Sequence, residues 1–237
     1  MKDQDEAQAV REVRERYARR AVHDARYSLF DPAALRERQG RQRALLQMLS
    51  SHGLTDLSAL RLVEVGCGDG HNLLELLQLG FAPEHLHGIE LLPPRHAAAR
   101  HALPTATALW LGDASVAPVE PASLDLVLAA TVFSSLLDDA FQQRLADSMW
   151  RWLRPGGAVL WYDFTVNNPR NADVRGVPLR RVQSLFPQGR VDSRRLTLAP
   201  PLARAVCKVH PALHGVFNAL PLLRTHRLIW LGKPARG

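Results

Sequence analysis

The feature that most constrains this fold is a short apolar run that ends in three closely spaced glycines. Residues 60–65 are mostly apolar, and Gly66, Gly68 and Gly70 follow them directly before a helical pattern of leucines. Glycine lets a backbone turn sharply and approach a ligand, and the N-terminus of the following helix offers free amide groups. The pattern therefore predicts a strand, a ligand-binding turn and a helix. A tight turn that binds nothing is the alternative.

The spacing of the glycines favours one kind of ligand over another. It is G-x-G-x-G, and not the G-x-G-x-x-G of dinucleotide-binding folds. Glu64 also stands two positions before the first glycine. A carboxylate there would repel a pyrophosphate, but it would attract the sulfonium and amino groups of S-adenosylmethionine.

Two further acidic residues stand where the next strands are expected to end. Glu90 ends the segment 86–90, twenty residues after Gly70, and Asp113 follows the segment 106–111. A carboxylate at Glu90 can accept hydrogen bonds from both hydroxyls of a ribose. One at Asp113 can accept from an adenine amino group. Taken alone, each of them could equally be an ordinary loop carboxylate.

The rest of the chain alternates between strand and helix patterns. Strands are expected at 60–65, 86–90, 106–111, 124–130, 158–162, 190–198 and 225–231. Helices are expected at 5–22, 32–49, 94–102, 139–153 and 178–186, and after Gly70. Such alternation indicates βαβ units and a parallel sheet with right-handed crossovers. The last two strands are expected to form an antiparallel pair at the edge of that sheet.

In this order and at these separations, the motifs of residues 60–163 resemble the class I S-adenosylmethionine-dependent methyltransferases. The resemblance implies an α/β, Rossmann-like, doubly wound sheet of seven strands, mostly parallel with an antiparallel edge strand. N-terminal helices and a helical insertion near the C-terminus would be added to it. The resemblance also implies S-adenosyl-L-methionine as the cofactor. It places that cofactor against Tyr17, Glu64, Gly66, Cys67, Gly68, Gly70, Glu90, Leu91, Asp113, Ala114, Ala130 and Thr131.

The expected organisation is a single methyltransferase domain over 1–237. Residues 1–55 would form a helical lid on the cofactor, where Tyr17 or Tyr27 serves as a lid residue or as a plain packing aromatic. Residues 56–163 would form the cofactor-binding core, and 164–237 the substrate-side elements. The apolar insertion 199–224 is expected to be a helical hairpin that caps the active site. A dimer face and a membrane contact are the alternatives for it.

Charge is unevenly distributed along the chain, whose net charge is +7. Residues 164–237 hold 13 Lys or Arg against 2 Asp or Glu. A basic end of this kind suits an anionic substrate, a nucleic acid or an anionic membrane surface. The two cysteines, Cys67 and Cys207, form no disulfide framework, and the N-terminus is charged where a signal peptide needs an apolar run. Both observations favour the cytoplasm, with the inner face of the membrane left open.

Methyl transfer to a hydroxyl needs a base, and Asp163, at the end of the fifth expected strand, is the candidate. Its alternative role is to orient a loop. The residues expected to bind the acceptor are Phe133, Asn167, Arg170 and Arg175. Arginine suits phosphate or carboxylate, although such arginines are commonly solvated surface. No metal is expected, because no Cys and His cluster has zinc spacing and the histidines show no pairing with a carboxylate.

Outside the core the chain is similar to methyltransferases of bacterial glycan and O-antigen biosynthesis. The residues behind this likeness include 26–30, 161–164, 167–171, 198–204 and 223–226. It implies O-methylation of a sugar, a lipid-linked glycan or another small-molecule hydroxyl. RNA modification, methylation of a natural product or a carboxylate, and a non-catalytic binding subunit are the alternatives. The chain lacks an appended RNA-binding motif, which disfavours nucleic acid. A homodimer remains open.

Overall fold

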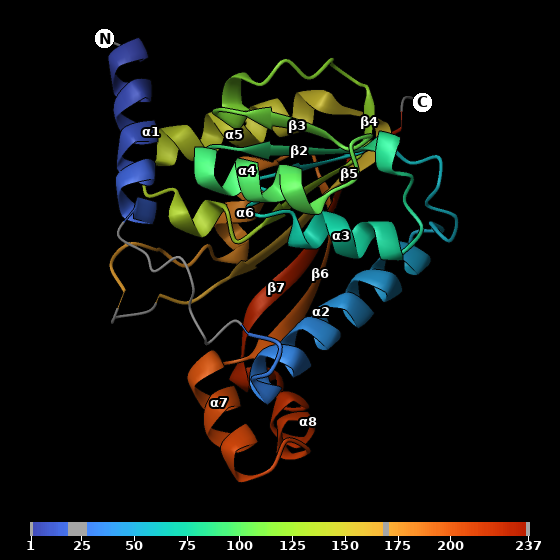
Figure 1. Cartoon of the computed structure of the whole chain (residues 1–237), viewed down its shortest axis with the longest axis vertical. Helices are drawn as coiled ribbons and strands as arrows, with labels where there is room; N and C mark the ends of the chain where they lie inside the picture. Colours follow the sequence, from blue (N-terminus) through green and yellow to red (C-terminus); the bar gives the residue numbers. More distant parts are fainter. Residues whose placement is uncertain (1, 19–27, 168–170, 236–237) are drawn as a thin grey trace.

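The computed structural model describes residues 2–18, 28–167 and 171–235, and a seven-stranded sheet forms its centre (Figure 1). The strands are Leu62–Val65 (β1), Leu86–Glu90 (β2), Ala108–Leu111 (β3), Leu124–Ala130 (β4), Leu153–Phe164 (β5), Arg190–Leu198 (β6) and Arg224–Gly232 (β7). They lie in the order β3-β2-β1-β4-β5-β7-β6. Strands β1 to β5 are parallel, and β7 runs antiparallel to both β5 and β6. The expected Rossmann-like fold is confirmed, with the antiparallel strand β7 between β5 and β6.

Eight α-helices accompany the sheet in the described part of the chain. They are Lys2–Ala18 (α1), Pro32–Ser51 (α2), His71–Gln78 (α3), Pro93–Ala102 (α4), Asp139–Trp152 (α5), Leu179–Leu185 (α6), Pro200–Val209 (α7) and Leu213–Asn218 (α8). Short 3₁₀ turns lie at Pro83–His85 (η2), Ala114–Val116 (η3), Phe133–Ser135 (η4) and Pro221–Leu223 (η5). In the described chain, no helix is both apolar enough and long enough to cross a bilayer.

Helices cover both faces of the sheet, and the central strand β1 is therefore buried on both sides. In β1, Val63 and Val65 pack into one core with residues of α5 and α6. Leu62 points to the other face, into a second core with residues of α2, α3 and α4. A strand that is buried on both faces is apolar throughout instead of alternating. This explains the continuous apolar run in the sequence, in which Glu64 is the exception.

The expected element boundaries hold closely for most elements. Helix α1 begins at Lys2, and residues 19–22 of the expected helix lie outside the described residues. The main difference lies in β5. This strand begins at Leu153, five residues earlier than expected, because Leu153 pairs with Leu124 ahead of an irregularity in the β4–β5 register. Helix α2 begins as predicted: Asp31 Oδ1 accepts a hydrogen bond of 2.8 Å from the Ala33 amide, and Pro32 occupies the first helical position.

The insertion between β6 and β7 is a helical hairpin, as expected. Its helices α7 and α8 pack on the start of α2, where Ala33 joins a small core with Leu198, Ala203, Val206 and Cys207. Figure 1 shows the hairpin at the end of the molecule opposite to α1. The hairpin therefore extends the α2 face of the sheet.

Candidate active site

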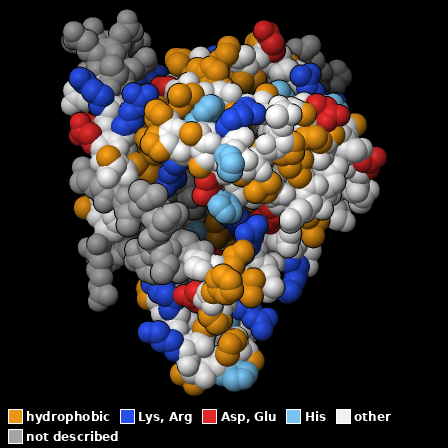
Figure 2. All heavy atoms as spheres, viewed as in Figure 1, with side chains coloured by type: hydrophobic (Ala, Val, Ile, Leu, Met, Phe, Trp, Pro, Cys, Tyr) orange, Lys and Arg blue, Asp and Glu red, His pale blue; other side chains and the backbone are white. Residues whose placement is uncertain are grey.

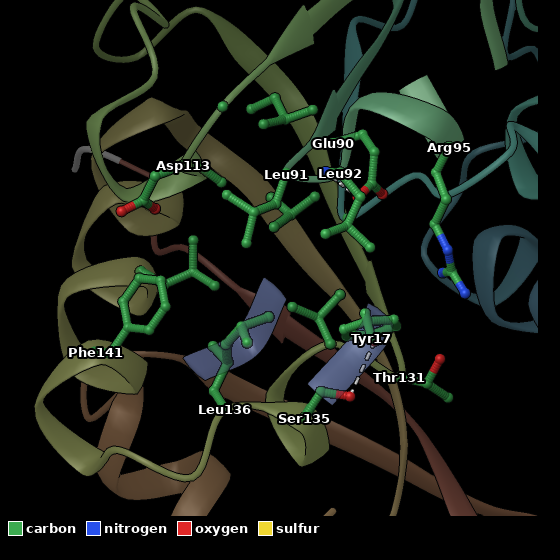
Figure 3. Close-up of a pocket in the computed structure, with 18 of the residues that line it drawn as sticks. Tyr17, Glu90, Leu91, Leu92, Arg95, Asp113, Thr131, Ser135, Leu136 and Phe141 are labelled. Carbon is green, nitrogen blue, oxygen red and sulfur yellow. Dashed lines mark hydrogen bonds between the residues drawn. The ribbon is translucent and has the colours of Figure 1, made fainter. Parts of the chain in front are cut away.

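A cavity opens at the carboxyl ends of β1, β2 and β4, beside the residues that follow β3 (Figure 3). This is the edge where open α/β sheets bind ligands. Eight of the residues expected to bind the cofactor line it: Tyr17, Gly66, Glu90, Leu91, Asp113, Ala114, Ala130 and Thr131. The other four, Glu64, Cys67, Gly68 and Gly70, lie in β1 or in the glycine turn beside the cavity.

One half of the cavity carries large apolar side chains, and the other carries a basic and a hydroxyl side chain. Figure 3 shows Leu136 and Phe141 in the half that holds Asp113, whereas Arg95 and Thr131 lie in the other half. Sequence reasoning did not single out Leu136, Phe141 or Arg95. The first two belong to a core-like apolar pattern, and Arg95 belongs to an ordinary helix, so no local signal marked them as lining residues.

The glycine turn adopts the backbone that its sequence requires. Gly66, Gly68 and Gly70 have φ values of +65°, +59° and +86°, a left-handed region that other residues rarely adopt. A Cβ on Gly66 would lie 2.9 Å from Val132 Cγ2. The thiol of Cys67 is buried in the α2-side core, and this burial raises its pKa. The thiol is therefore a packing group, and cofactor contacts at this position would come from the backbone.

The Glu90 carboxylate ties the glycine turn to the end of β2. Its Oε2 accepts a hydrogen bond of 2.8 Å from the Gly68 amide, and its Oε1 accepts one of 2.8 Å from the Leu92 amide. The side chain is buried, with 5% exposed. Glu90 thus lines the cavity and also fixes the shape of its floor, a second role that sequence reasoning missed.

Glu64 carries a buried carboxylate with one oxygen unpaired. Its Oε1 accepts a hydrogen bond of 2.6 Å from Asn72 Nδ2, and its Oε2 has no partner among the described residues. Burial raises the pKa of Glu64 to about 8. An orphaned buried oxygen is costly unless something satisfies it. A cationic amino group is a partner of the right chemistry, so this residue fits S-adenosylmethionine.

Helix α1 is fastened over the cavity by its last turns. Arg16 Nη2 donates to the Ser135 carbonyl at 3.1 Å, and the Tyr17 hydroxyl lies 3.1 Å from Ser135 Oγ. The guanidinium of Arg95 lies 4.8 Å from the centre of the Tyr17 ring, in cation–π contact. Tyr17 thus occupies the position expected of a lid residue. The alternative lid residue, Tyr27, is outside the described residues.

Asp113 and Thr131 mark the ends of two strand segments at the cavity. Asp113 Oδ1 accepts a hydrogen bond of 2.8 Å from the Ser115 amide and so caps η3. Thr131 follows β4 with a φ of +56°, and its amide donates to the Tyr162 carbonyl at 2.7 Å. A left-handed conformation is strained for a β-branched residue and often marks a functional turn.

Asp163 does not line the cavity. It is buried, its Oδ2 accepts from the Ser134 amide at 3.0 Å, and its Oδ1 accepts from the Phe164 amide at 2.9 Å. Burial raises the pKa of Asp163 to about 6. Unlike Glu90, the Asp163 carboxylate is buried away from the cavity, and its contact with the Ser134 amide holds η4, so the geometry favours the alternative role of orienting a loop over that of a general base.

The residues expected to bind the acceptor are engaged elsewhere. Phe133 is fully buried, with its ring centre 4.2 Å from that of Trp161, and it lines neither this cavity nor the second one described below. Asn167 Oδ1 accepts from the Gly176 amide at 2.8 Å, closing the loop after β5. Arg175 forms an ion pair with Asp139. Arg170 lies outside the described residues.

The insertion is expected to cap the active site; it does not reach the cofactor cavity, whereas residues of α8 line the second cavity described below, so the cap stays a prediction. No residue of α7 or α8 lines the cavity described above. The hairpin packs on α2 instead, because its buried apolar side chains form a small core with Ala33 of α2 and Leu198 of β6.

A second, smaller cavity lies on the α2 face of the sheet. Arg36, Glu37, Gly40 and Arg41 of α2, Leu196 and Thr197 of β6, and His214 and Asn218 of α8 line it. Thr197 has a φ of +62°, and its hydroxyl lies 2.7 Å from that of Tyr162. Sequence reasoning missed this cavity, since its residues are distant in the chain and share no motif.

A hydrogen-bonded chain joins the second cavity to the glycine turn. Arg41 Nη2 donates to Asn72 Oδ1 at 2.7 Å, and Asn72 in turn donates to Glu64. The Arg41 guanidinium also lies 5.5 Å from the centre of the Tyr162 ring. These hydrogen bonds thus link α2, α3 and β1.

Two histidines pair with carboxylates, contrary to expectation. His71 Nδ1 lies 2.5 Å from Asp69 Oδ1 in the glycine turn, and His52 Nε2 lies 3.4 Å from Asp192 Oδ2. Both members of the first pair are well exposed. Three or more metal-ligating side chains gather nowhere in the described ranges.

Comparison with known proteins places this geometry in context. Residues 63–161 match the family model of the methyltransferase domain. An S-adenosylmethionine-dependent methyltransferase from Mesorhizobium loti has 15% identity and a TM-score of 0.58, over 80% of this chain and 98% of that one. A methyltransferase from Archaeoglobus fulgidus has 14% identity and a TM-score of 0.58, over 84% and 98%. Geranyl diphosphate C-methyltransferase from Streptomyces coelicolor has 12% identity and a TM-score of 0.57, over 82% and 77%. No curated protein matches the sequence.

The fold is the one shared by these S-adenosylmethionine-dependent methyltransferases, and it places a cavity at the carboxyl edge of its sheet. Residues 63–161, which hold the glycine turn and most of the lining of that cavity, match the model of the methyltransferase domain. The solved structures share the fold at low identity and do not fix the methyl acceptor.

Proposed function

We propose that this chain methylates a hydroxyl of a sugar or of another small polyhydroxylated acceptor. When bound, S-adenosylmethionine supplies an electrophilic methyl group on a sulfonium. The work of the protein is then to hold both reactants in line and to exclude water. The chain's own residues fall into a set suited to the cofactor and a set suited to the acceptor.

The residues suited to the cofactor are those at the carboxyl ends of β1 to β4. Glu90 would accept from the ribose hydroxyls, and Asp113 from the adenine amino group, with Leu136 and Phe141 beside it as apolar walls. Glu64, with its unpaired oxygen, would accept from the amino group of the methionine moiety. Tyr17 would close the cavity from α1.

The proposed acceptor class rests on the second cavity. This cavity lies between the carboxyl end of β6 and the first half of α2, on the half of the carboxyl edge that the cofactor residues leave unused. It presents donors (Arg36 and Arg41), acceptors (Glu37 and the buried, unpartnered Asn218 Oδ1) and the Thr197 hydroxyl. Sugar hydroxyls both donate and accept, so a mixed lining suits them, whereas an arginine-only lining suits phosphate.

The arginines after β5 give less support to an anionic acceptor. Arg175 pairs with Asp139, and Arg181 donates to the Asp139 carbonyl and to Gln142 Oε1. Each of these guanidinium groups already has an acidic or carbonyl partner within the chain. The excess of basic residues in the C-terminal part therefore does not by itself indicate that an anionic substrate binds at this loop.

The test is methyl transfer from radiolabelled S-adenosylmethionine by the purified full chain. The panel contains monosaccharides, nucleotide-activated sugars and lipid-linked sugars, together with total RNA and small carboxylic acids. We expect label in a sugar class and methyl ether linkage in the product. Label confined to RNA or to the carboxylic acids would overturn the proposal.

Variants of the second cavity make the test specific. Glu37→Gln and Asn218→Ala are expected to raise KM for the sugar by about tenfold each, the usual effect of one buried hydrogen bond of ~1.4 kcal/mol. The affinity for S-adenosylhomocysteine should stay unchanged in both. Glu84→Gln, at an exposed glutamate of η2, is the matched control. An unchanged KM in both variants would remove this cavity from acceptor binding.

A further inference from the structure

Large apolar side chains are exposed at the end of the molecule that carries α7 and α8. Phe30 is 98% exposed, Leu222 90% and Val209 78%. Leu29, Val216 and Leu220 are also exposed, so these six make up half of the twelve exposed large apolar side chains among the described residues. Monomeric proteins rarely gather such side chains without a use for them. We call these six residues the apolar tip.

Two segments that are distant in the sequence build the apolar tip. Leu29 and Phe30 precede the Asp31 cap of α2, and the other four belong to the hairpin or its flanks. The segments are held together because Ala33 packs against Ala203, Val206 and Cys207 of α7. Figure 1 shows the hairpin projecting from the body of the molecule, and Figure 2 shows hydrophobic and basic side chains over the same end.

The Lys, Arg, Asp and Glu side chains that follow Asp192, in the segment with the hairpin, are all basic. The sequence contains no Asp or Glu after Asp192, while Arg204, Lys208 and Arg224 lie within or beside the hairpin. On the α2 side, Asp31 and Glu37 are acidic: the Asp31 carboxylate accepts from the Ala33 amide as a helix cap, and Glu37 lies in the second cavity among Arg36, Arg41 and, from α7, Arg204. Positive charge around a projecting apolar surface is complementary to an anionic lipid surface.

We propose that the apolar tip docks on a membrane that contains anionic lipids. Phe30, Val209 and Leu222 would enter the boundary between headgroups and acyl chains, and the basic side chains would contact lipid phosphates. The cofactor cavity is lined by Val13 and Tyr17 of α1 and by no residue of the hairpin. Figure 1 shows α1 and the hairpin at opposite ends of the molecule, so docking of the apolar tip leaves that cavity accessible. This docking does not depend on which acceptor is methylated.

Flotation of the purified full chain with vesicles tests the proposal. One vesicle population is pure phosphatidylcholine, and the other contains 30% phosphatidylglycerol. We expect binding to the anionic vesicles, at least tenfold weaker binding to the neutral ones, and loss of binding as salt is raised from 0.1 to 0.5 M. Equal binding to both vesicles, or none, would overturn the proposal.

Variants connect the binding to the apolar tip. Phe30→Ser and Leu222→Ser are each expected to weaken partitioning by about tenfold, the equivalent of ~1.5 kcal/mol of lost apolar burial. Leu46→Ser and Val116→Ser, at exposed positions outside the tip, are the matched controls and should bind as the parent does. Thermal melting and S-adenosylhomocysteine binding show that each variant is folded.

The outcomes separate membrane docking from other uses of the tip. If Leu222→Ser abolishes a concentration-dependent dimer and vesicle binding is absent, the tip is an interface between two copies and the proposal is wrong. If the control variants lose as much binding as the tip variants, the attraction is nonspecific and the proposal is also wrong.

Discussion

Replacing Glu90 with glutamine tests whether this residue holds the glycine turn as well as a ligand. In the structure its two carboxylate oxygens accept from the amides of Gly68 and Leu92, both at 2.8 Å. Glutamine keeps one acceptor oxygen, and its NH₂ group faces the other amide, so one buried amide is left unpaired. Loss of one hydrogen bond to a charged group and an unpaired buried amide cost about 1–3 kcal/mol each.

We therefore expect the free energy of unfolding to fall by about 2–6 kcal/mol in the absence of any ligand, because both effects act on the free protein. For a chain of this size, that corresponds to a fall in Tm of roughly 4–24 °C. Urea denaturation and thermal melting without cofactor measure it. Glu84→Gln, at an exposed glutamate, should change stability by less than ~0.5 kcal/mol.

The same variant should also bind S-adenosylhomocysteine about 10- to 100-fold more weakly, since the turn and the ribose acceptor are both altered. Full stability together with weakened binding would show that Glu90 serves the ligand alone. Full stability together with full affinity would refute both roles.

Three further expectations follow from buried and paired charges. Because burial raises the pKa of Glu64 to about 8, above its value in the unfolded chain, its contribution to stability is complete below pH ~4.5 and is lost as pH rises towards 8. Glu64→Gln should flatten the fall of Tm between pH 5 and 8, measured without cofactor, and an unchanged slope would contradict the assignment. Asp163→Asn should lower Tm and kcat together without changing how kcat depends on pH, because the carboxylate orients η4; an unchanged Tm together with loss of a fall in kcat below pH ~6 would restore Asp163 as the base. Arg175→Ala should change the free energy of unfolding by less than ~1 kcal/mol and leave the KM of the acceptor unchanged, since its ion pair with Asp139 is partly exposed; a large rise in KM would contradict this.

The sequence predicts the fold well because its strongest signals are local. The continuous apolar strands, the glycine turn and the Asp31 cap each depend on residues within a few positions of one another, and the structure has them at the expected places. Handedness and parallel pairing then follow from general rules of α/β sheets. The fold therefore needed little information from distant contacts.

The site is predicted only in part, because side-chain partners depend on contacts between distant segments. The position of Asp163 at a strand end suggested a base, but the Ser134 amide from another loop occupies its carboxylate. Phe133 lies one turn beyond β4, where Trp161 of β5 draws it into the core. Arg175 looked free in the sequence, and Asp139 lies 36 positions away.

The second cavity and the hairpin show the same limit. Arg41, Thr197 and Asn218 meet only because α2, β6 and α8 pack together. The apolar run 199–224 predicts a hairpin, and the structure has one, but where the hairpin docks depends on Ala33 of α2. A sequence pattern sets the shape of such an insertion, whereas the complementary surface on the rest of the chain sets its place.

Calorimetric titration of the full chain with S-adenosylhomocysteine, and in parallel with NAD⁺, tests the central claim most directly. We expect one saturable site for S-adenosylhomocysteine and no binding of NAD⁺, because the turn has G-x-G-x-G spacing and Glu64 stands before it. Asp113→Ala should bind S-adenosylhomocysteine more weakly, because the Asp113 carboxylate lines the cavity. Binding of NAD⁺ in place of S-adenosylhomocysteine, or S-adenosylhomocysteine binding that is indifferent to both Glu90→Gln and Asp113→Ala, would contradict the account.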